Sequence, residues 1–430
     1  MKFEVLKQSH LKRNIMIGVI AVLIISAIIL NFTRAKYRTT QSIPLVNGTI
    51  NYSLADLNIV AITVDGETVD TIPEGNYELT EESYCTVNGE EDSSISISYE
   101  ADTQLLTVTP FTTKGTKCYL DFVTATTKKV DTVLGTIDVN LDTPNFANTS
   151  CTSGCDETTV GIYETTDNLG TSYYYRGDVE NNYVQFAGYY WRIIRINGDG
   201  SVRIIYDGTS AHANGDSSTD RQIGTSAFNS TNGSYTGGFT YELNTQRPSF
   251  QNGGTASTIK EVLDSWYTTN IINKVLDDQV VSVPGFCNDR EMASGYSWSA
   301  QPSEVIRYAA YERLYTNKAP TLRCSNNLDL YTTKIGLITA DELTMAGSPW
   351  YSDLNSNNDS FYLYTGQCYW TITPFDIDRG ISFNFFVSSP SNNQLNGLIL
   401  NMHGVRPVIN LSADVTLTGS GTATDPYIVS

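Results

Sequence analysis

Histidine and charged residues are scarce in this chain of 430 residues, and their scarcity excludes several kinds of protein. Histidine occurs three times, as His10, His212 and His403. A histidine-based catalytic triad or a histidine-rich metal site therefore has little support, and exposed loop histidines are expected. Only 17% of the residues are charged. That fraction is too low for the Lys- and Glu-rich helices of a bundle.

Basic side chains are in particular deficit, because the chain carries a net charge of −19. Residues 1–38 hold 7 of the 27 basic side chains and 1 of the 46 acidic ones, so residues 39–430 hold 20 basic and 45 acidic ones. Such an acidic surface repels nucleic acid, and no basic stripe offsets it, so nucleic acid is excluded as a partner. Abundant Tyr, Thr, Asn, Ser and Gly instead favour strands, long loops and a secreted surface.

One long apolar run is present, over residues 15–32. About 18 residues of helix span roughly 27 Å, close to the hydrocarbon core of a bilayer. A cleaved signal peptide would have a shorter apolar region and a small-residue cleavage site, whereas "NFTR" follows here. The sequence therefore predicts a cytoplasmic tail at 1–14, an uncleaved transmembrane signal anchor at 15–32 and a tether at 33–43. The rest would be an extracellular ectodomain on a single-pass membrane protein.

Seven cysteines follow the apolar run, and their regional spacing predicts local disulfides. Such bonds need an oxidising compartment. Reduced buried thiols are the alternative, whereas a zinc site would need a second close pair or histidine partners. The expected pairs are Cys85–Cys118, Cys151–Cys155 and Cys287–Cys324, with Cys368 left as a free thiol.

Turn signals and hydrophobic patterns divide the ectodomain into two modules. Several short strands predict an all-β, sandwich-like module over 44–124. Residues 125–158 are rich in Thr, Asn and Asp and are expected to be a linker. The second module, 159–430, mixes strands and helices and is predicted to be α+β. Helices are expected at 258–280, 303–315 and 339–347.

The stretch "YYWRIIRINGDGSVRIIYDG", residues 189–208, has an oxygen-rich centre that could indicate a calcium loop. It lacks the downstream bidentate acid of an EF-hand site. Asn-Gly and Asp-Gly supply the positive φ that a tight turn between two β-branched runs needs. The stretch therefore predicts a β-hairpin.

Several stretches of the chain resemble one protein family. They are "ENNYVQFAGYYWRIIRINGDGSVRIIYDG", "IGLITADELTMAG", "LYTGQCYWTITPFD" and "GVRPVINLSADVTLTGSGTATDPYIV", within roughly 160–430. In this order they resemble uncharacterised membrane-anchored surface proteins of Firmicutes, and "TRAKYRTTQSIPLVNGTINYS" is similar to the N-terminal module of that family. The late pattern of Trp, Thr-Pro, a Gly-containing hairpin and Gly-Val-Arg-Pro resembles the core of C-type-lectin-like domains.

This resemblance implies a C-type-lectin-like fold, which formylglycine-generating enzymes share, for residues 159–430. It identifies neither a reaction nor a ligand. Formylglycine chemistry would need a close pair of reactive cysteines in the C-terminal core that the late motifs form, where Cys368 is the only cysteine, so that activity is not expected.

The segment "DLNSNNDSFYLY" contains oxygen side chains at alternate positions, as in a calcium loop. Asn358 and Tyr364 replace the usual Gly and Glu, so a solvated loop is the alternative. The candidate calcium ligands are Asp353, Asn355, Asn357 and Asp359.

Three further residues are candidates for ligand binding. Asp376 and Asp378 in "PFDIDRG" would share one face of a strand, and paired carboxylates can act on glycosides. Trp370 could stack on a sugar ring, although its predicted strand makes a core position the alternative. Arg406 in "GVRPV" is expected to form a buried ion pair or backbone contacts rather than to bind substrate.

These features predict a membrane-anchored bacterial cell-surface protein that binds a glycan or a protein without catalysis. The alternatives are an extracellular glycan-active hydrolase and a purely structural envelope protein. No cofactor is expected apart from a calcium ion.

Overall fold

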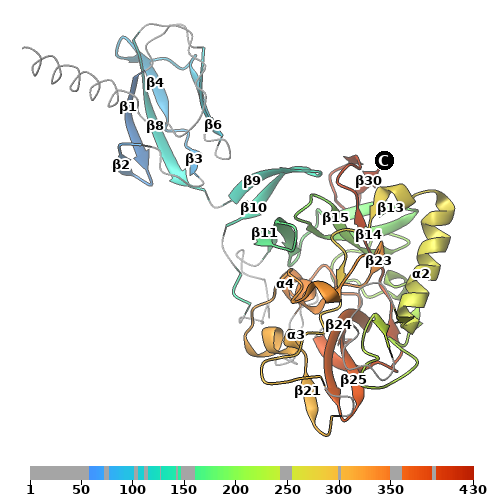
Figure 1. Ribbon diagram of the computed structural model, residues 1–430. Helices are drawn as coiled ribbons and strands as arrows, with labels where there is room; N and C mark the ends of the chain where they lie inside the picture. The colour runs from blue at the N-terminus through green and yellow to red at the C-terminus, as the bar shows by residue number, and fades with distance from the viewer. Residues whose placement is uncertain are drawn as a thin grey trace, which may run out of the picture. The chain divides into compact units, whose positions relative to one another are not determined.

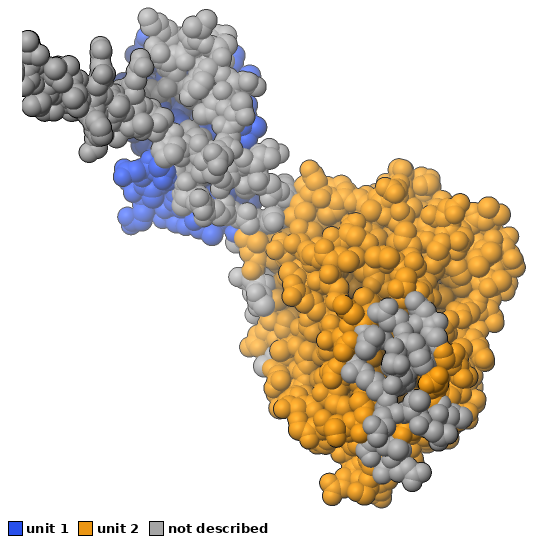
Figure 2. Space-filling view, viewed as in Figure 1, with its two compact units in different colours: residues 1–125 blue, residues 126–430 orange. Residues whose placement is uncertain are grey.

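The computed structural model describes residues 58–71, 77–100, 105–110, 115–125, 127–141, 144–146, 160–242, 254–298, 302–348, 361–389 and 394–430. The chain divides into two compact units, Met1–Ala125 and Thr126–Ser430, and strands dominate the described part of both (Figure 1 and Figure 2). The predicted anchor and tether lie outside the described residues. Within the described ranges, no helix is both long and apolar enough to cross a membrane.

The first unit is an all-β module, as the sequence predicted. Its strands are β1 Asn58–Val64, β2 Glu67–Val69, β3 Tyr77–Leu79, β4 Tyr84–Val87, β5 Glu90–Glu91, β6 Ser96–Glu100, β7 Leu105–Thr109 and β8 Thr116–Thr124. The main sheet has the order β2-β1-β8-β4-β5, and β3 pairs with β8. β6 and β7 form a separate hairpin.

Buried side chains at every second position of β8 form the core of this unit. Cys118, Leu120 and Phe122 share one face of the strand and are buried, as the twofold period of a strand requires. Cys85 of β4 lies directly opposite Cys118 and forms a disulfide with it, which confirms the predicted pair. The β6–β7 hairpin packs on the same cluster through Ile97, Tyr99, Leu106 and Val108.

The larger sheet of the second unit contains most of its early strands. They are β9 Thr127–Thr132, β10 Gly135–Asn140, β11 Gly161–Thr166, β12 Thr171–Arg176, β13 Tyr183–Phe186, β14 Tyr189–Ile196, β15 Val202–Gly208, β19 Val280–Val281, β23 Ile335–Gly336, β28 Val408–Leu411, β29 Leu417–Thr418 and β30 Tyr427–Val429. The order is β19-β28-β15-β14-β12-β11-β10-β9, and the other strands join at its sides.

A second sheet contains β16 Thr225–Ser226, β21 Val305–Arg307 and the strands between residues 369 and 404. The latter are β24 Tyr369–Asp378, β25 Ile381–Val387, β26 Gln394–Leu398 and β27 His403–Gly404. The order is β16-β27-β24-β25-β26. β21 pairs with β24, and Figure 1 labels these two strands together with β25. Short pairs are formed by β17 Thr240–Tyr241 with β18 Thr255–Ala256, and by β20 Phe286–Cys287 with β22 Leu330–Tyr331.

Short helices accompany these sheets. The α-helices are α2 Thr258–Asn270, α3 Ala309–Tyr311 and α4 Ala340–Ala346, and a π-helical turn covers Glu312–Thr316. Short 3-10 turns cover Thr219–Arg221, Ile272–Lys274, Asp277–Gln279 and Asn327–Asp329. One apolar core runs through the unit and includes the fully buried Trp191 and Trp370.

β9 and β10 correct the expectation that residues 125–158 form a linker. They are a hairpin at the edge of the larger sheet, where β10 pairs with β11. Ile137 and Val139 are buried and alternate with more exposed residues, which the Thr- and Asp-rich composition of the interval concealed. Cys151 and Cys155 lie outside the described residues.

β14 and β15 form the antiparallel hairpin that the sequence predicted over 189–208. The N–H of Asn197 donates to the carbonyl of Ser201 at 2.8 Å and closes the turn. The carboxylate of Asp199 accepts from the N–H and the hydroxyl of Ser201, at 3.1 and 2.6 Å. Asp199 therefore stabilises the turn, and the hairpin interpretation is confirmed.

The three helix predictions have different outcomes. The one at 339–347 is confirmed by α4, which begins with the Thr339–Glu342 capping box and ends at Gly347. The one at 258–280 is too long, because α2 ends at Asn270. The one at 303–315 is wrong in its first part, where Ile306 packs against the second sheet as part of β21. Tertiary packing there outweighs the helical spacing.

Candidate functional site

The four candidate calcium ligands, Asp353, Asn355, Asn357 and Asp359, lie outside the described residues. The described residues on either side of them are joined through Gly177, directly after β12. The N–H of Gly177 donates to the carbonyl of Ala346 at 2.9 Å, and its carbonyl accepts from the N–H of Tyr362 at 3.2 Å. One backbone residue thus holds both flanks of the candidate segment.

Three buried arginines reinforce these flanks. Arg176 donates to the carbonyls of Thr344 and Met345, at 2.9 and 2.7 Å, at the end of α4. Arg221 and Arg406 donate to carbonyls on the other flank, namely those of Tyr362, Leu363 and Tyr364. Charged donors on backbone carbonyls form stronger hydrogen bonds than neutral donors, so both flanks are firmly held.

Asp207 of β15 is fully buried and binds two of these arginines. Arg221 and Arg406 each place a nitrogen 2.8 Å from its Oδ1 atom. Arg192 is also fully buried, and its guanidinium lies 3.7 Å from the ring centre of Tyr183. The expectation that Arg406 forms a buried ion pair and backbone contacts is confirmed.

Trp370 is fully buried in the main apolar cluster of the second unit. Its indole N–H donates to the carbonyl of Ser226 at 2.9 Å, and its ring contacts Phe228, Phe386 and His403. This corrects the expectation that its ring is open to a sugar. Trp370 belongs to β24, a strand of ten residues within the second sheet, and its neighbours there cover the indole. The alternative that Trp370 is a core residue is therefore correct.

Asp376 and Asp378 lie on β24 beside the turn that leads into β25. The Asp376 carboxylate is buried, and its Oδ2 atom lies 3.0 Å from a guanidinium nitrogen of Arg307. Burial raises the pKa of Asp376 to about 7, because it outweighs the lowering effect of Arg307. Asp378 is half-buried, 3.3 Å from the exposed Arg379. Asp378 is therefore the more accessible of the two acids.

A cavity of about 30 Å³ with several charged side chains in its lining lies beside the Cys287–Cys324 disulfide. A cavity of that size holds roughly two water molecules. Its charged lining comes from Asp167, Arg195, Arg203, Asp289, Arg313, Arg323, Asp341 and Glu342. The cavity is therefore suited to water between buried charges rather than to a sugar ring.

Glu342 of α4 is the centre of the first charge network at this cavity. Its Oε1 atom lies 3.0 Å from Arg195 of β14 and 2.7 Å from Arg203 of β15. Burial alone would raise the pKa of Glu342, but the charges of the two arginines outweigh burial and lower it to about 2. Asp167 binds the other side of Arg195 at 2.8 Å. The capping box therefore also fixes α4 to the larger sheet.

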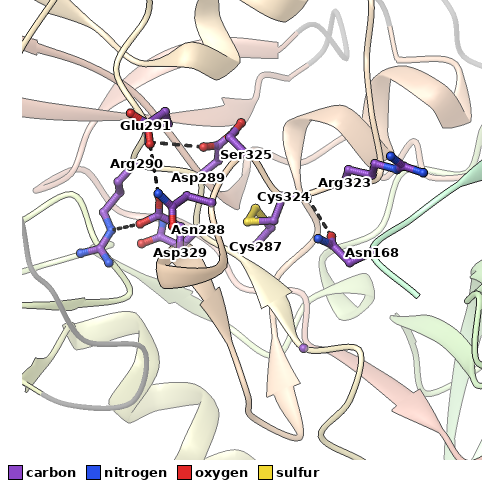
Figure 3. The surroundings of a disulfide bond; sticks show 12 residues. Asn168, Cys287, Asn288, Asp289, Arg290, Glu291, Arg323, Cys324, Ser325 and Asp329 are labelled. Atoms are coloured by element: carbon purple, nitrogen blue, oxygen red, sulfur yellow. Dashed lines mark hydrogen bonds and ion pairs between the residues drawn. A yellow bond between two sulfur atoms is a disulfide. The ribbon is translucent and has the colours of Figure 1, made fainter. Parts of the chain in front are cut away.

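Arg313 is the centre of the second network. It places one nitrogen 3.0 Å from Asp289 and 2.7 Å from Asp341. Burial lowers the pKa of Arg313, but the two carboxylates outweigh this effect and raise it above its ordinary value. Ser325 donates to Asp289 at 2.7 Å, as Figure 3 shows.

The Cys287–Cys324 disulfide joins the segment that contains Asp289 to the segment that contains Ser325. It confirms the predicted pair. Figure 3 shows Asn168 directed toward Cys324, whose N–H donates to its side-chain oxygen at 2.9 Å. On the other side of the bond, Arg290 and Asp329 form an ion pair of 3.2 Å. The disulfide thus holds two charged loops at the cavity.

Cys368 is a free thiol, as the sequence predicted. Its sulfur accepts a hydrogen bond from the N–H of Ser389 at 3.3 Å. Among the described residues, no group of three or more His, Cys, Asp or Glu side chains is placed to hold a metal ion.

The expectation of exposed loop histidines is wrong for both described histidines. His403 stacks on Phe386 with ring centres 4.2 Å apart, and burial lowers its pKa to about 4. His212 places Nε2 2.8 Å from Asp220, with 13% of its side chain exposed. Both side chains therefore have structural partners.

Sequence reasoning missed the buried charge networks, although one signal for them exists. Arg192, Arg195 and Arg203 interrupt the apolar strands β14 and β15. A charged residue in a buried strand needs a charged or hydrogen-bonding partner, so these positions indicate networks even before their partners are known.

Comparisons of the chain with protein-family models, with curated proteins and with solved structures found no match.

Proposed function

We propose that this protein is a single-pass, membrane-anchored bacterial cell-surface protein whose ectodomain binds a glycan or a protein without catalysis. The observation that carries the proposal is a disulfide in each unit, Cys85–Cys118 and Cys287–Cys324. Disulfides persist in oxidising compartments, so the two bonds favour a location outside the cytoplasm. The apolar run at 15–32 supplies the means of attachment.

The resemblance to Firmicute surface proteins with a C-type-lectin-like domain supports the same role. Strands of two sheets with short helices between them suit such an α+β domain. Loops held by a rigid sheet framework commonly carry recognition, because the framework fixes their ends while their sequences vary.

We place ligand recognition on the segment that contains Asp353, Asn355, Asn357 and Asp359, with a calcium ion as its cofactor. Support comes from its flanks, since Gly177, Arg176 and Arg406 hold them at fixed positions. A binding segment with fixed ends loses less conformational entropy when a ligand binds.

The ion-pair partners of the buried carboxyl groups favour a binding role over acid–base catalysis. Asp376 faces Arg307, and Glu342 faces Arg195 and Arg203. Glu342 neutralises two buried guanidinium groups and Asp376 is bonded to Arg307, so a catalytic role would require either group to leave its partner.

The test is a glycan array probed with residues 39–430, with and without calcium. Specific binding supports the proposal, and its loss on chelation supports the calcium site. Release of sugar from the array would instead establish the hydrolase alternative. An absence of both binding and release, together with failure to capture a defined surface protein, would favour a structural envelope role.

A further inference from the structure

We propose that Asp376 and Arg307 form a pH-sensitive latch that holds strand β21 on strand β24. β21 stays docked while the Asp376 carboxyl carries a proton, and it loosens once that carboxyl is ionised. The latch concerns the second sheet alone and does not depend on the identity of the ligand.

The latch position is fixed by strand register. β21 has only three residues, and Arg307 lies directly opposite Asp376 in the ladder with β24. On its other side, β21 is held by a backbone bond of 3.0 Å from the N–H of Ala293 to the carbonyl of Arg307. Because the ladder is this short, the side-chain pair adds to the attachment that its backbone bonds and the packing of Ile306 provide.

The surroundings of Asp376 favour its neutral form. Its Oδ2 atom has a single guanidinium contact, and its Oδ1 atom is buried without a partner in the described structure. Asp378, two residues along the same strand, adds a like charge. The residues opposite these acids on β25 are Phe383 and Ile381, which cannot stabilise an anion.

Arg307 does not need an ionised Asp376 to keep its place. Its guanidinium carbon lies 4.1 Å from the ring centre of Tyr311 in α3 and 5.5 Å from that of Phe375. Such cation–π contacts stabilise the guanidinium when the carboxyl is neutral. The neutral latch therefore leaves no buried charge without a partner, whereas the ionised latch leaves one carboxylate oxygen unsatisfied.

The direction of the pH effect follows from this preference. Burial raises the pKa of Asp376 from 3.8 to about 7 in the folded protein. The folded state therefore retains a proton that the open state releases between these values. The stabilisation is complete below about pH 4 and is lost as the pH rises through 7.

Hydrogen–deuterium exchange of the full-length chain between pH 5 and pH 9 tests the latch. Exchange rates of peptides covering β21 and β24 are divided by the intrinsic rates at each pH, and the β14–β15 hairpin serves as internal reference. We expect protection of β21 to fall by up to roughly tenfold per pH unit between pH 5 and the midpoint near pH 7, and to level off above it. Protection that does not change with pH would overturn the proposal.

Three variants separate the latch from general pH effects. Asp376→Asn should keep β21 protected at pH 8, more than roughly tenfold above wild type, and should abolish the pH dependence. Asp378→Asn should move the midpoint to lower pH because it removes a like charge. Arg307→Met should move it to higher pH because it removes the compensating charge. A midpoint that stays fixed in both of the last two variants would contradict the latch, even if Asp376→Asn fails to fold.

Discussion

Nη1 of Arg203 lies 2.7 Å from Oε1 of Glu342, which joins β15 of the larger sheet to the first turn of α4. Both side chains are about 2% exposed, so the pair is isolated from solvent. The same carboxylate accepts the backbone N–H of Thr339 at 2.9 Å through its other oxygen. One side chain therefore caps the helix and neutralises a buried charge of the sheet.

Glu342→Gln is expected to destabilise the second unit by about 3 kcal/mol, because it leaves the buried Arg203 without a carboxylate and Arg195 with Asp167 alone. Urea denaturation followed by tryptophan fluorescence would measure the change. Glu180→Gln is the matched control, since Glu180 is exposed, and its effect should stay within about 0.5 kcal/mol. Equal denaturation midpoints for the two variants would show that the network contributes nothing to stability.

The same residue should make the protein sensitive to acid. The pKa of Glu342 in the folded protein, about 2, lies below its ordinary value of 4.5. Its charge therefore stabilises the fold fully above pH 4.5, and this contribution is lost as the pH falls toward 2. The difference in unfolding free energy between wild type and Glu342→Gln should shrink over that interval. A difference that is constant from pH 6 to pH 3 would refute the assignment.

Elements formed by residues close in sequence could be predicted, whereas ion pairs between residues far apart in sequence could not. The helix at 339–347 and the turn at Asn197–Ser201 are formed by residues close in sequence, and both were predicted. Arg203 and Glu342 are separated by 139 positions, and Arg406 and Asp207 by 199. Only the tertiary fold brings such pairs together, so a single sequence indicates that a buried arginine needs a partner but not which one.

The two described disulfides should each stabilise their own unit. They close loops with sequence separations of 33 and 37 residues, for which the chain-entropy model gives about 3–4 kcal/mol. Cys287→Ser with Cys324→Ser should therefore lower the stability of the second unit and leave the first unchanged. Cys368→Ser is the control, because that thiol is free. Non-reducing peptide mapping that links Cys368 to another cysteine would refute the pairing, including the predicted Cys151–Cys155 bond.

The predicted anchor can be tested on protein extracted from membranes. The run at 15–32 is followed by "NFTR" rather than by a small-residue cleavage site, so we expect the mature chain to retain it. N-terminal sequencing or intact mass should give a chain that still contains residues 15–32. A mature N-terminus beyond Phe32 would show that the segment is a cleaved signal peptide.

Calcium should stabilise the second unit if the segment with Asp353, Asn355, Asn357 and Asp359 binds it. A ligand that binds only the folded state adds about 2.7 kcal/mol when its concentration is 100 times its dissociation constant. Calorimetric titration and thermal unfolding, each at millimolar calcium, would detect this. Asp353→Ala with Asp359→Ala should abolish the heat and the thermal shift, because these substitutions remove both charged oxygen ligands of the candidate set. Asp414→Ala, an exposed acid of the same unit, should retain both responses. Wild-type protein that shows neither response would remove calcium from the proposed site, while a response that survives the double substitution would place the ion elsewhere.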